Sequence, residues 1–241
     1  MPKAIAWGIT GAGSFLRESV ETIIEIVERG IPVTVYCSKA GESLLKSYGL
    51  IDKLAARVKG AYPTEIVYES KEPPSYPSTG RFYVDIYDLA VISPATLNTS
   101  SKIVHGISDS LVSNLASHAL KNNIQLLILP VDYFETKSTI PIKILRDNCG
   151  KCFECTAAEA CPTGALTKDS NWKVRLDISK CTRCFECLRN CPWNAILFDV
   201  EIMVKPNPYY VKIIEKLYEI PNVRIIEHPR KVLELLSGER P

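Results

Sequence analysis

Short β-branched runs alternate with helical patterns along the first 148 residues of this 241-residue chain. Apolar residues follow one another in five runs, which predict buried strands at residues 4–9, 32–37, 65–68, 88–92 and 125–129. Apolar residues recur at helical spacing in 14–29 and 109–122, and Ser108 is placed to cap the second of these helices. The alternation is typical of parallel βαβ units, so we predict a three-layer, Rossmann-like α/β domain.

Two further stretches complete this pattern. Residues 71–80 are rich in Pro and Ser and predict a surface loop. Near the C-terminus, residues 207–219 predict a helix, 223–227 a strand and 229–237 a second helix with Pro229 at its start. About forty residues are too few to bury a core of their own. We therefore expect this segment to pack back onto the N-terminal sheet; the alternative is that it covers the segment in between.

That intervening segment carries eight of the nine cysteines in two runs. The runs are Cys149-x2-Cys152-x2-Cys155-x5-Cys161-Pro162 and Cys181-x2-Cys184-x2-Cys187-x3-Cys191-Pro192. Three thiolates at two-residue intervals can wrap one face of a [4Fe–4S] cluster, and the remote cysteine before proline ligates the other cluster. The predicted ligand sets are Cys149, Cys152, Cys155 and Cys191 for one cluster, and Cys181, Cys184, Cys187 and Cys161 for its neighbour. The first run departs from the bacterial pattern, since five residues rather than three precede Cys161.

Disulfide bonds and zinc are the competing explanations for these cysteines. Disulfides require an oxidising compartment, and tetrahedral zinc sites use two Cys-x2-Cys pairs rather than two runs of four that each end in Cys-Pro. The ninth cysteine, Cys37, ends an apolar strand, and we expect its side chain to pack in the core rather than to bind a metal. Trp172 and Trp193 flank the runs and are expected to shield the clusters from water.

Composition adds few restrictions. With 46% apolar residues the chain can bury a core, and its net charge of +2 is too small to argue for nucleic acid. The N-terminus lacks the zones of a secretory signal, and no apolar run approaches the roughly 20 residues that cross a bilayer. We expect a soluble, cytoplasmic protein with no membrane or nucleic-acid partner. Residues 149–191 hold seven Lys/Arg and five Asp/Glu, which suits docking of an acidic ferredoxin.

A second cofactor is indicated after the first strand, where small residues run from Gly8 to Ser14. Small residues allow a backbone to approach a phosphate at a helix N-terminus. A dinucleotide fingerprint would have glycine at position 16 and an acid after the second strand, but the chain has Leu16 and Ser38-Lys39 there. A hydroxyl and a cation suit a terminal phosphate, which favours a mononucleotide such as FMN.

The fourth strand leads into Ser93-Pro94-Ala95-Thr96-Leu97-Asn98-Thr99. This segment resembles the Pro-Ala-x-x-Asn-Thr flavin loop of the homo-oligomeric flavin-containing cysteine decarboxylase superfamily, and residues 7–13 and 38–42 are most similar to its archaeoflavoprotein branch. Together with the eight-cysteine ferredoxin-like segment, the chain resembles the iron–sulfur flavoprotein form of dihydromethanopterin reductase. The resemblance spans essentially the whole chain.

The resemblance implies an FMN site and a homo-oligomer, because members of the superfamily form trimers or larger symmetric assemblies. The residues that it implies for FMN are Thr10, Gly11, Ala12, Gly13, Ser14, Phe15, Ser38, Lys39, Pro94, Ala95, Thr96, Asn98, Thr99 and Ser110. It also implies a division into a flavoprotein part at 1–147, an inserted α+β ferredoxin-like module with two [4Fe–4S] clusters at 148–198, and a segment at 199–241 that returns to the flavoprotein domain.

The implied activity is that of an oxidoreductase, which passes electrons from reduced ferredoxin through two [4Fe–4S] clusters to FMN and on to dihydromethanopterin, giving tetrahydromethanopterin.

His105 follows the flavin loop and could donate a proton, although a structural role on a helix is the stronger interpretation. Two alternatives remain. One is an electron-transfer flavoprotein between protein carriers; the other is a flavin-dependent decarboxylase or prenyltransferase, which the absence of histidine in residues 80–87 disfavours.

Overall fold

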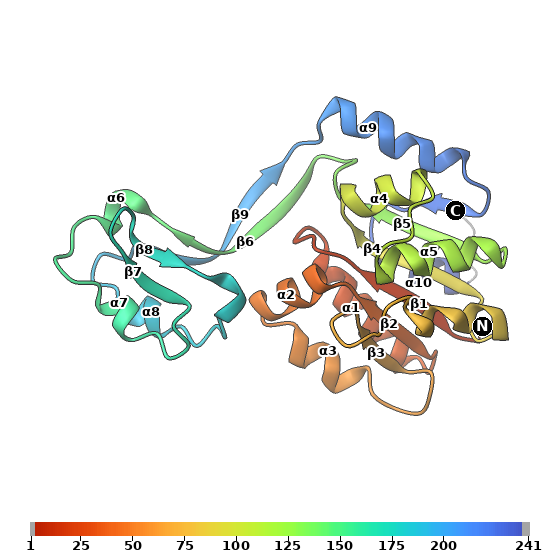
Figure 1. Cartoon of the computed structure of the whole chain (residues 1–241), viewed down its shortest axis with the longest axis horizontal. Coiled ribbons are helices and arrows are strands. Elements are labelled where there is room, and N and C mark those ends of the chain that lie inside the picture. Colours follow the sequence, from red (N-terminus) through yellow and green to blue (C-terminus); the bar gives the residue numbers. More distant parts are fainter. Residues whose placement is uncertain (1–2, 238–241) are drawn as a thin grey trace.

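The computed structural model describes residues 3–237. Six parallel strands form the central sheet in the order β10-β5-β4-β1-β2-β3 (Figure 1). Their bounds are β1 Ile5–Ile9, β2 Val33–Cys37, β3 Glu65–Tyr68, β4 Leu89–Ala95, β5 Gln125–Pro130 and β10 Val223–Ile225. The predicted α/β class is confirmed, and β4 continues past the predicted end at Ile92 to include Pro94 and Ala95.

Helices cover both faces of the sheet and make the three predicted layers. One core contains residues of α1 (Leu16–Glu28), α3 (Ile51–Arg57) and α10 (Lys231–Ser237), and the other contains residues of α5 (Leu111–Lys121) and α9 (Pro208–Glu215). Strand β1 serves both, since Ile5 and Trp7 lie in the first core whereas Ala6 lies in the second. Successive side chains of a strand point to opposite faces, so a strand covered on both sides is apolar throughout.

The C-terminal segment adds the strand at one edge of the sheet. Val223 of β10 is the parallel partner of Leu126 in β5. Val232 and Leu233 of α10 are buried in the first core, and Ile214 of α9 lies in the second. The helix expected at 207–219 is divided into α9 and a 3-10 helix, η3 (Lys216–Glu219).

One local prediction is wrong and another holds in part. Ser110, not Ser108, caps α5, because its hydroxyl and that of Ser113 each bond to the other's backbone N–H. The surface loop expected at 71–80 is present at 71–76, but its last residues belong to a 3-10 helix, η1 (Pro77–Val84), in which Thr79 is buried and Phe82 packs in the second core. Helices α2 (Lys39–Ser47), α3 and α4 (Leu97–Val104) are additions to the predicted elements.

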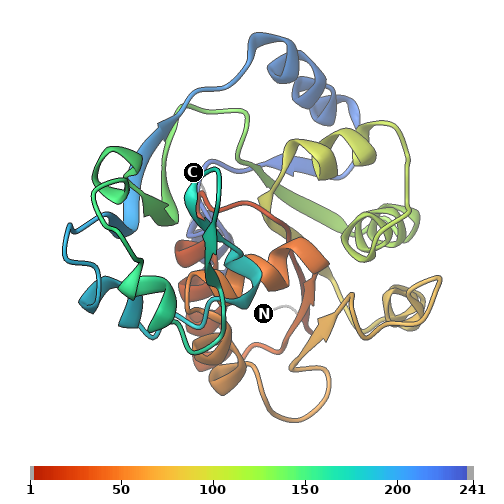
Figure 2. The same ribbon diagram turned by 60° about the vertical axis from the view of Figure 1, so that its left-hand side comes forward.

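A long antiparallel ribbon leaves the sheet domain and returns to it. Its strands are β6 (Thr136–Ile144) and β9 (Ile196–Val204), and the sequence predicted neither. Beyond the ribbon lies the cysteine-rich part, which we call the cluster module (Figure 1). It contains α6 (Arg146–Cys149), α7 (Thr156–Glu159), β7 (Leu166–Asp169), β8 (Lys173–Leu176), η2 (Ile178–Lys180) and α8 (Glu186–Arg189). In Figure 2 this module lies in front of the first part of the chain, on the side of α2.

The cluster module has a small core of its own. Its buried residues are Ile142, Cys149, Ala157, Leu166, Val174, Ala195 and Ile196, and five further cysteines pack against them. So few apolar side chains bury little surface, and modules of this size usually depend on a metal or on disulfides for stability. The cysteines are therefore part of what holds the module together.

Candidate functional site

The predicted flavin residues meet at the carboxyl edge of the sheet, where α1, α2, α4 and α5 begin. Thr10 ties two of the loops together: its hydroxyl donates to the Pro94 carbonyl (2.7 Å) and accepts from the Thr96 N–H (2.9 Å). Trp7 and Ser19 reinforce this contact by bonding to the carbonyl and the hydroxyl of Ser93. Thr10 is buried, so its role here is to position the loops that surround a ligand.

The first loop is held too tightly for side chains. A Cβ at Gly11 would lie 2.6 Å from the Cβ of Ala40, and one at Gly13 would overlap the Tyr48 hydroxyl. Among residues 3–237, no hydrogen-bond acceptor is found for the backbone N–H groups of Gly11, Gly13 and Ser14. Unpaired N–H groups ahead of a helix suit phosphate oxygens. The loop therefore fits the phosphate end of a flavin mononucleotide.

Three of the predicted hydroxyl contacts cap helices. Ser38 accepts from the Gly41 N–H (3.0 Å), Thr96 from Thr99 (3.3 Å), and Ser110 from Ser113 (3.4 Å). The three helices all begin at the carboxyl edge of the sheet. Because helix N-termini carry a partial positive charge, several such charges lie at one edge. Asn98 is exposed beside this edge, whereas Pro94, Ala95 and Thr99 are buried.

Sequence reasoning missed two carboxylates here. Glu69, just after β3, accepts from the backbone N–H of Lys39 (2.9 Å) and of Leu111 (3.2 Å). Asp132, just after β5, accepts from the Leu97 N–H (2.8 Å). Both follow the carboxyl ends of parallel strands, and that position is the signal that would have identified them.

His105 lies apart from these loops. It is the exposed residue that ends α4, eight positions after Leu97. At 1.5 Å per residue the two are about 12 Å apart along the helix axis. The structure therefore gives His105 no contact with the flavin edge of its own chain.

The eight module cysteines surround two separate cavities. The first is lined by Cys149, Cys152, Cys155 and Cys191, together with Trp193. The second is lined by Cys161, Cys181, Cys184 and Cys187, together with Phe185. The structure thus brings together the two crossed sets that the spacing predicts. Trp172 packs instead beside the Arg146 guanidinium, 5.5 Å from its ring centre.

The chemistry of these cavities fits an iron–sulfur cluster. Backbone N–H groups point at sulfur, from Arg183 to Cys181 (3.4 Å) and from Ala195 to Cys191 (3.3 Å). Burial, followed by the neighbouring Cys181 thiol, raises the pKa of Cys187 to about 11. Thiolates crowded in this way need a cationic partner to stay charged, and metal binding supplies one.

The alternatives for these cysteines find no support in the structure. All nine cysteines are free of disulfides. Zinc needs its ligands around one point, and within residues 3–237 no group of three or more His, Cys, Asp or Glu is placed to hold a single ion. Cys37 is fully buried, as expected.

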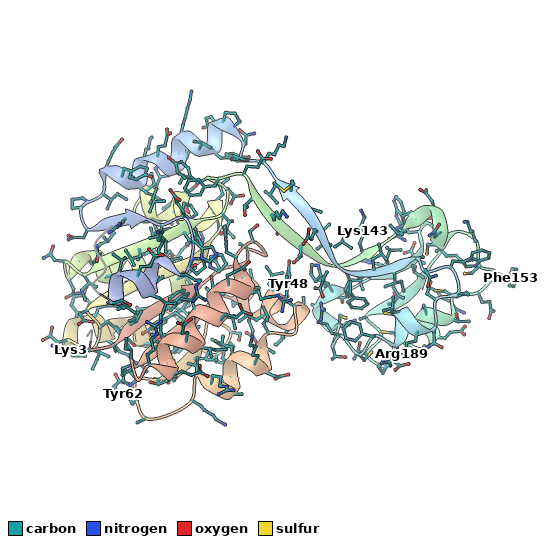
Figure 3. The ribbon with its side chains drawn as sticks, turned by 180° about the vertical axis from the view of Figure 1, so that it is seen from behind. Lys3, Tyr48, Tyr62, Lys143, Phe153 and Arg189 are labelled. Carbon is teal, nitrogen blue, oxygen red and sulfur yellow. The ribbon has the colours of Figure 1, made fainter. Side chains whose placement is uncertain are left out.

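One corner of the sheet domain contacts both the ribbon and the cluster module. This corner, Ser47-Tyr48-Gly49, follows the end of α2 (Figure 3). Tyr48 donates to the Thr139 carbonyl of β6, and burial raises the pKa of its hydroxyl, which keeps the proton in place. Because the same hydroxyl lies against Gly13, Tyr48 links the first loop of the flavin edge to the ribbon.

Arg183, between two cysteines of the second cavity, contacts this corner directly. Its guanidinium donates to the Ser47 carbonyl (3.2 Å) and pairs with Asp199 (2.6 Å), and the side chain is only 12% exposed. Gly49 allows the close approach, since its φ is +67° and a Cβ there would lie 3.1 Å from Arg183 Cδ. The second cavity therefore lies beside the sheet domain, and no signal in the sequence pointed to this contact.

Comparison with known proteins agrees with the two-part structure. Residues 1–138 match the Flavoprotein family, and residues 141–192 match the 4Fe-4S dicluster domain. The predictions of a flavin and two [4Fe–4S] clusters are thereby confirmed. No helix in the described part of the chain is long and apolar enough to cross a membrane.

Two relatives match nearly the whole chain. The dihydromethanopterin reductase (acceptor) of Methanosarcina mazei is 38% identical over 235 residues, covering 96% of this chain and 98% of the relative. The enzyme of the same name from Methanocaldococcus jannaschii is 38% identical over 237 residues, covering 97% of this chain and 95% of the relative.

The fold is shared with a solved structure, Burkholderia xenovorans DmrB in complex with FMN, described as a cubic protein cage for redox transfer. The TM-score is 0.62 at 19% identity, over 98% of this chain and 95% of that one. The flavoprotein sheet, the two cysteine cavities and the near full-length matches lead to one conclusion: this chain belongs to the dihydromethanopterin reductase (acceptor) family of iron–sulfur flavoproteins.

Proposed function

We propose that this protein reduces dihydromethanopterin to tetrahydromethanopterin with electrons from a reduced ferredoxin. The pterin takes up two electrons and two protons, whereas a ferredoxin gives electrons singly. When bound, [4Fe–4S] clusters carry single electrons and FMN collects them in pairs for the substrate. The residues of the chain bind these groups and set their order.

The order of the sites is the observation that carries this proposal. Arg183, from the loop of the second cavity, contacts Ser47 of the sheet domain. Phe153, from the loop of the first cavity, lies at the far end of the molecule (Figure 3). The sites therefore follow one another from the tip of the module to the sheet, as a relay requires.

Each group of residues has a distinct role in the proposal. The four cysteines of each cavity bind a cluster, and the N–H groups of Gly11, Gly13 and Ser14 bind the FMN phosphate. Thr10 and Glu69 position the surrounding loops, and Asn98 is exposed where it can meet the ring. Since the chain belongs to a superfamily of assemblies and its fold occurs in the Burkholderia cage, we also propose a homo-oligomer built on trimers.

One experiment tests the function. Protein purified without oxygen is assayed for iron, sulfide and flavin, reduced with ferredoxin, and mixed with dihydropterin while flavin absorbance is followed. We expect about eight irons per chain and a return of the oxidised flavin spectrum that requires the pterin. Reduction without pterin-dependent reoxidation would leave the second candidate, an electron carrier between proteins.

A further inference from the structure

The two cysteine runs share the tetrapeptide Cys-Phe-Glu-Cys, at residues 152–155 and 184–187. In the second run the aromatic side chain is half-buried. Phe185 packs against Phe198 with ring centres 4.7 Å apart, and the Arg183 guanidinium lies 5.4 Å from the Phe185 ring. Arg183 also contacts Ser47, so this side of the module faces the sheet domain.

In the first run the equivalent side chain is uncovered. Phe153 is 99% exposed and lies at the end of the module farthest from the sheet (Figure 3). Its loop is nevertheless held in place, because Lys173 Nζ donates to the carbonyls of Phe153 (2.9 Å) and Cys152. An exposed aromatic residue indicates an interaction surface when further apolar side chains near it are exposed as well.

Two more aromatic residues extend this surface. Trp193 lines the first cavity and is 46% exposed, and Lys151 Nζ lies 5.4 Å from its ring centre. Trp172 is 65% exposed beside Arg146. Aromatic residues and arginine are enriched where proteins bind one another.

The charges around these rings favour an acidic partner. Arg146, Trp172 and Arg175 line one surface hollow together with Asp169 and Asn171. Asp169 stays ionised within it, because its carboxylate accepts from the backbone N–H groups of Trp172 (2.8 Å) and Asn171 (2.9 Å), which lowers its pKa. The hollow therefore presents two guanidinium groups and one carboxylate to an approaching protein, a net positive charge.

Lys151 and Lys173 add two cations near the first cavity, and Asp147 and Glu154 are the exposed acids adjacent to it in sequence. Lys151 lies beside the Trp193 ring and Arg146 beside the Trp172 ring, so a partner with carboxylates around an apolar centre would meet a cation and a ring together. Complementary charge of this kind steers encounter and sets orientation.

We propose that the surface formed by Phe153, Trp172, Trp193, Arg146, Lys151 and Arg175, the donor face, docks a small acidic iron–sulfur protein. This proposal rests on the function proposed above and identifies where its electrons enter. In each encounter the docked protein is oxidised by one electron and the first cluster site is reduced by one. Two encounters supply the pair that the pterin takes up with two protons.

The test compares a protein donor with a small dye. Holoenzyme is reduced either by a dithionite-reduced acidic two-[4Fe–4S] ferredoxin or by reduced methyl viologen, which needs no docking face. We expect Phe153→Ala, Lys151→Glu and Arg175→Glu each to slow reduction by the ferredoxin by about tenfold at low salt, and to leave reduction by the dye unchanged. Isothermal titration calorimetry with oxidised ferredoxin should show affinity weakened by a similar factor.

Lys59→Glu is the matched control, since it reverses an exposed charge on the sheet domain; it should equal the wild type in both assays. Iron content is checked in every variant. Unchanged ferredoxin rate and affinity in all three donor-face variants, or wild-type protein that does not bind the ferredoxin, would overturn the proposal. So would a change in assembly mass in these variants, which would show that a second copy of the chain covers the face.

Failure of the proposed function is distinct: dye-reduced enzyme would then not be reoxidised by dihydropterin, whichever donor-face residues are replaced.

Discussion

The two halves of the cluster module begin from nearly the same residues and end in different surroundings. The two stretches are identical at five of seven positions and have a cation at a sixth: Cys149-Gly150-Lys151-Cys152-Phe153-Glu154-Cys155 and Cys181-Thr182-Arg183-Cys184-Phe185-Glu186-Cys187. Yet the second half contacts the sheet domain, whereas Phe153 of the first is 99% exposed. Local sequence determines how each half can hold its cluster; the neighbouring domain determines which half is covered.

Loss of a cysteine from either half should have the largest effect. We expect Cys152→Ala and Cys184→Ala each to lower iron from about eight to about four per chain. Because the sites are in series, flavin reduction by ferredoxin should fall at least about a hundredfold in both. Iron analysis and stopped-flow absorbance measure this, and Cys37→Ala serves as the control. A wild-type rate in either variant would mean that one half is not on the path.

Replacing the cation at the equivalent position of each half should have different effects. Arg183→Leu removes the bond to Ser47 and the ion pair with Asp199. Since the second cavity is then held less firmly against the sheet, flavin reduction driven by dye should slow on the order of tenfold. Hydrogen exchange should also increase in the ribbon strands. Lys151→Leu, the equivalent change in the first half, should alter neither measurement; equal effects of both would contradict the comparison.

The two phenylalanines should differ in stability. Phe185 contacts Phe198, so Phe185→Ala should destabilise the module by about 2 kcal/mol, less than for a fully buried ring. Phe153→Ala should stay within about 0.5 kcal/mol of wild type because the side chain is in water. Thermal unfolding under anaerobic conditions measures both. Equal melting temperatures would show that Phe185 is not held as described.

The smallest effect concerns the cysteine outside both halves. Burial raises the pKa of Cys37 to about 12, so its thiol stays protonated over the usual pH range and is also inaccessible. After iron removal, iodoacetamide at pH 8 should label the exposed Cys184 and spare Cys37. Mass spectrometry of peptides reads this out. Raising the pH to about 9.5 should still spare Cys37, since that remains well below its pKa; modification at the rate of Cys184 would refute its burial.

What the sequence could predict depends on the range of the signal. The cysteine runs and the Pro94–Thr99 loop are local patterns whose spacing reflects their chemistry, and the sheet follows from short apolar runs. The ribbon could not be predicted in the same way. Its two strands, β6 and β9, are half-exposed along most of their length, and they pair with each other although they lie far apart along the chain. Its register comes from pairing rather than from a buried face.

The junction was equally invisible. Arg183 and Ser47 are separated by 136 positions, and Tyr48 and Thr139 by 91. Nothing near Ser47 marks its carbonyl as a partner for a cluster loop. The error at the start of α5 has a different origin, since Ser108 and Ser110 are both good caps and only the reciprocal bonds with Ser113 select the second.

The ribbon has one more consequence. Thr136 and Val204, at its base, are direct cross-strand partners, and such residues lie about 5 Å apart. The polypeptide thus departs from the flavoprotein fold and rejoins it at a single point. Excising everything between these two positions would leave ends that a tight turn can join, with the six-stranded sheet still complete. The cluster module is in this sense separable from the flavoprotein fold, as expected of a domain inserted into an older protein without rebuilding it.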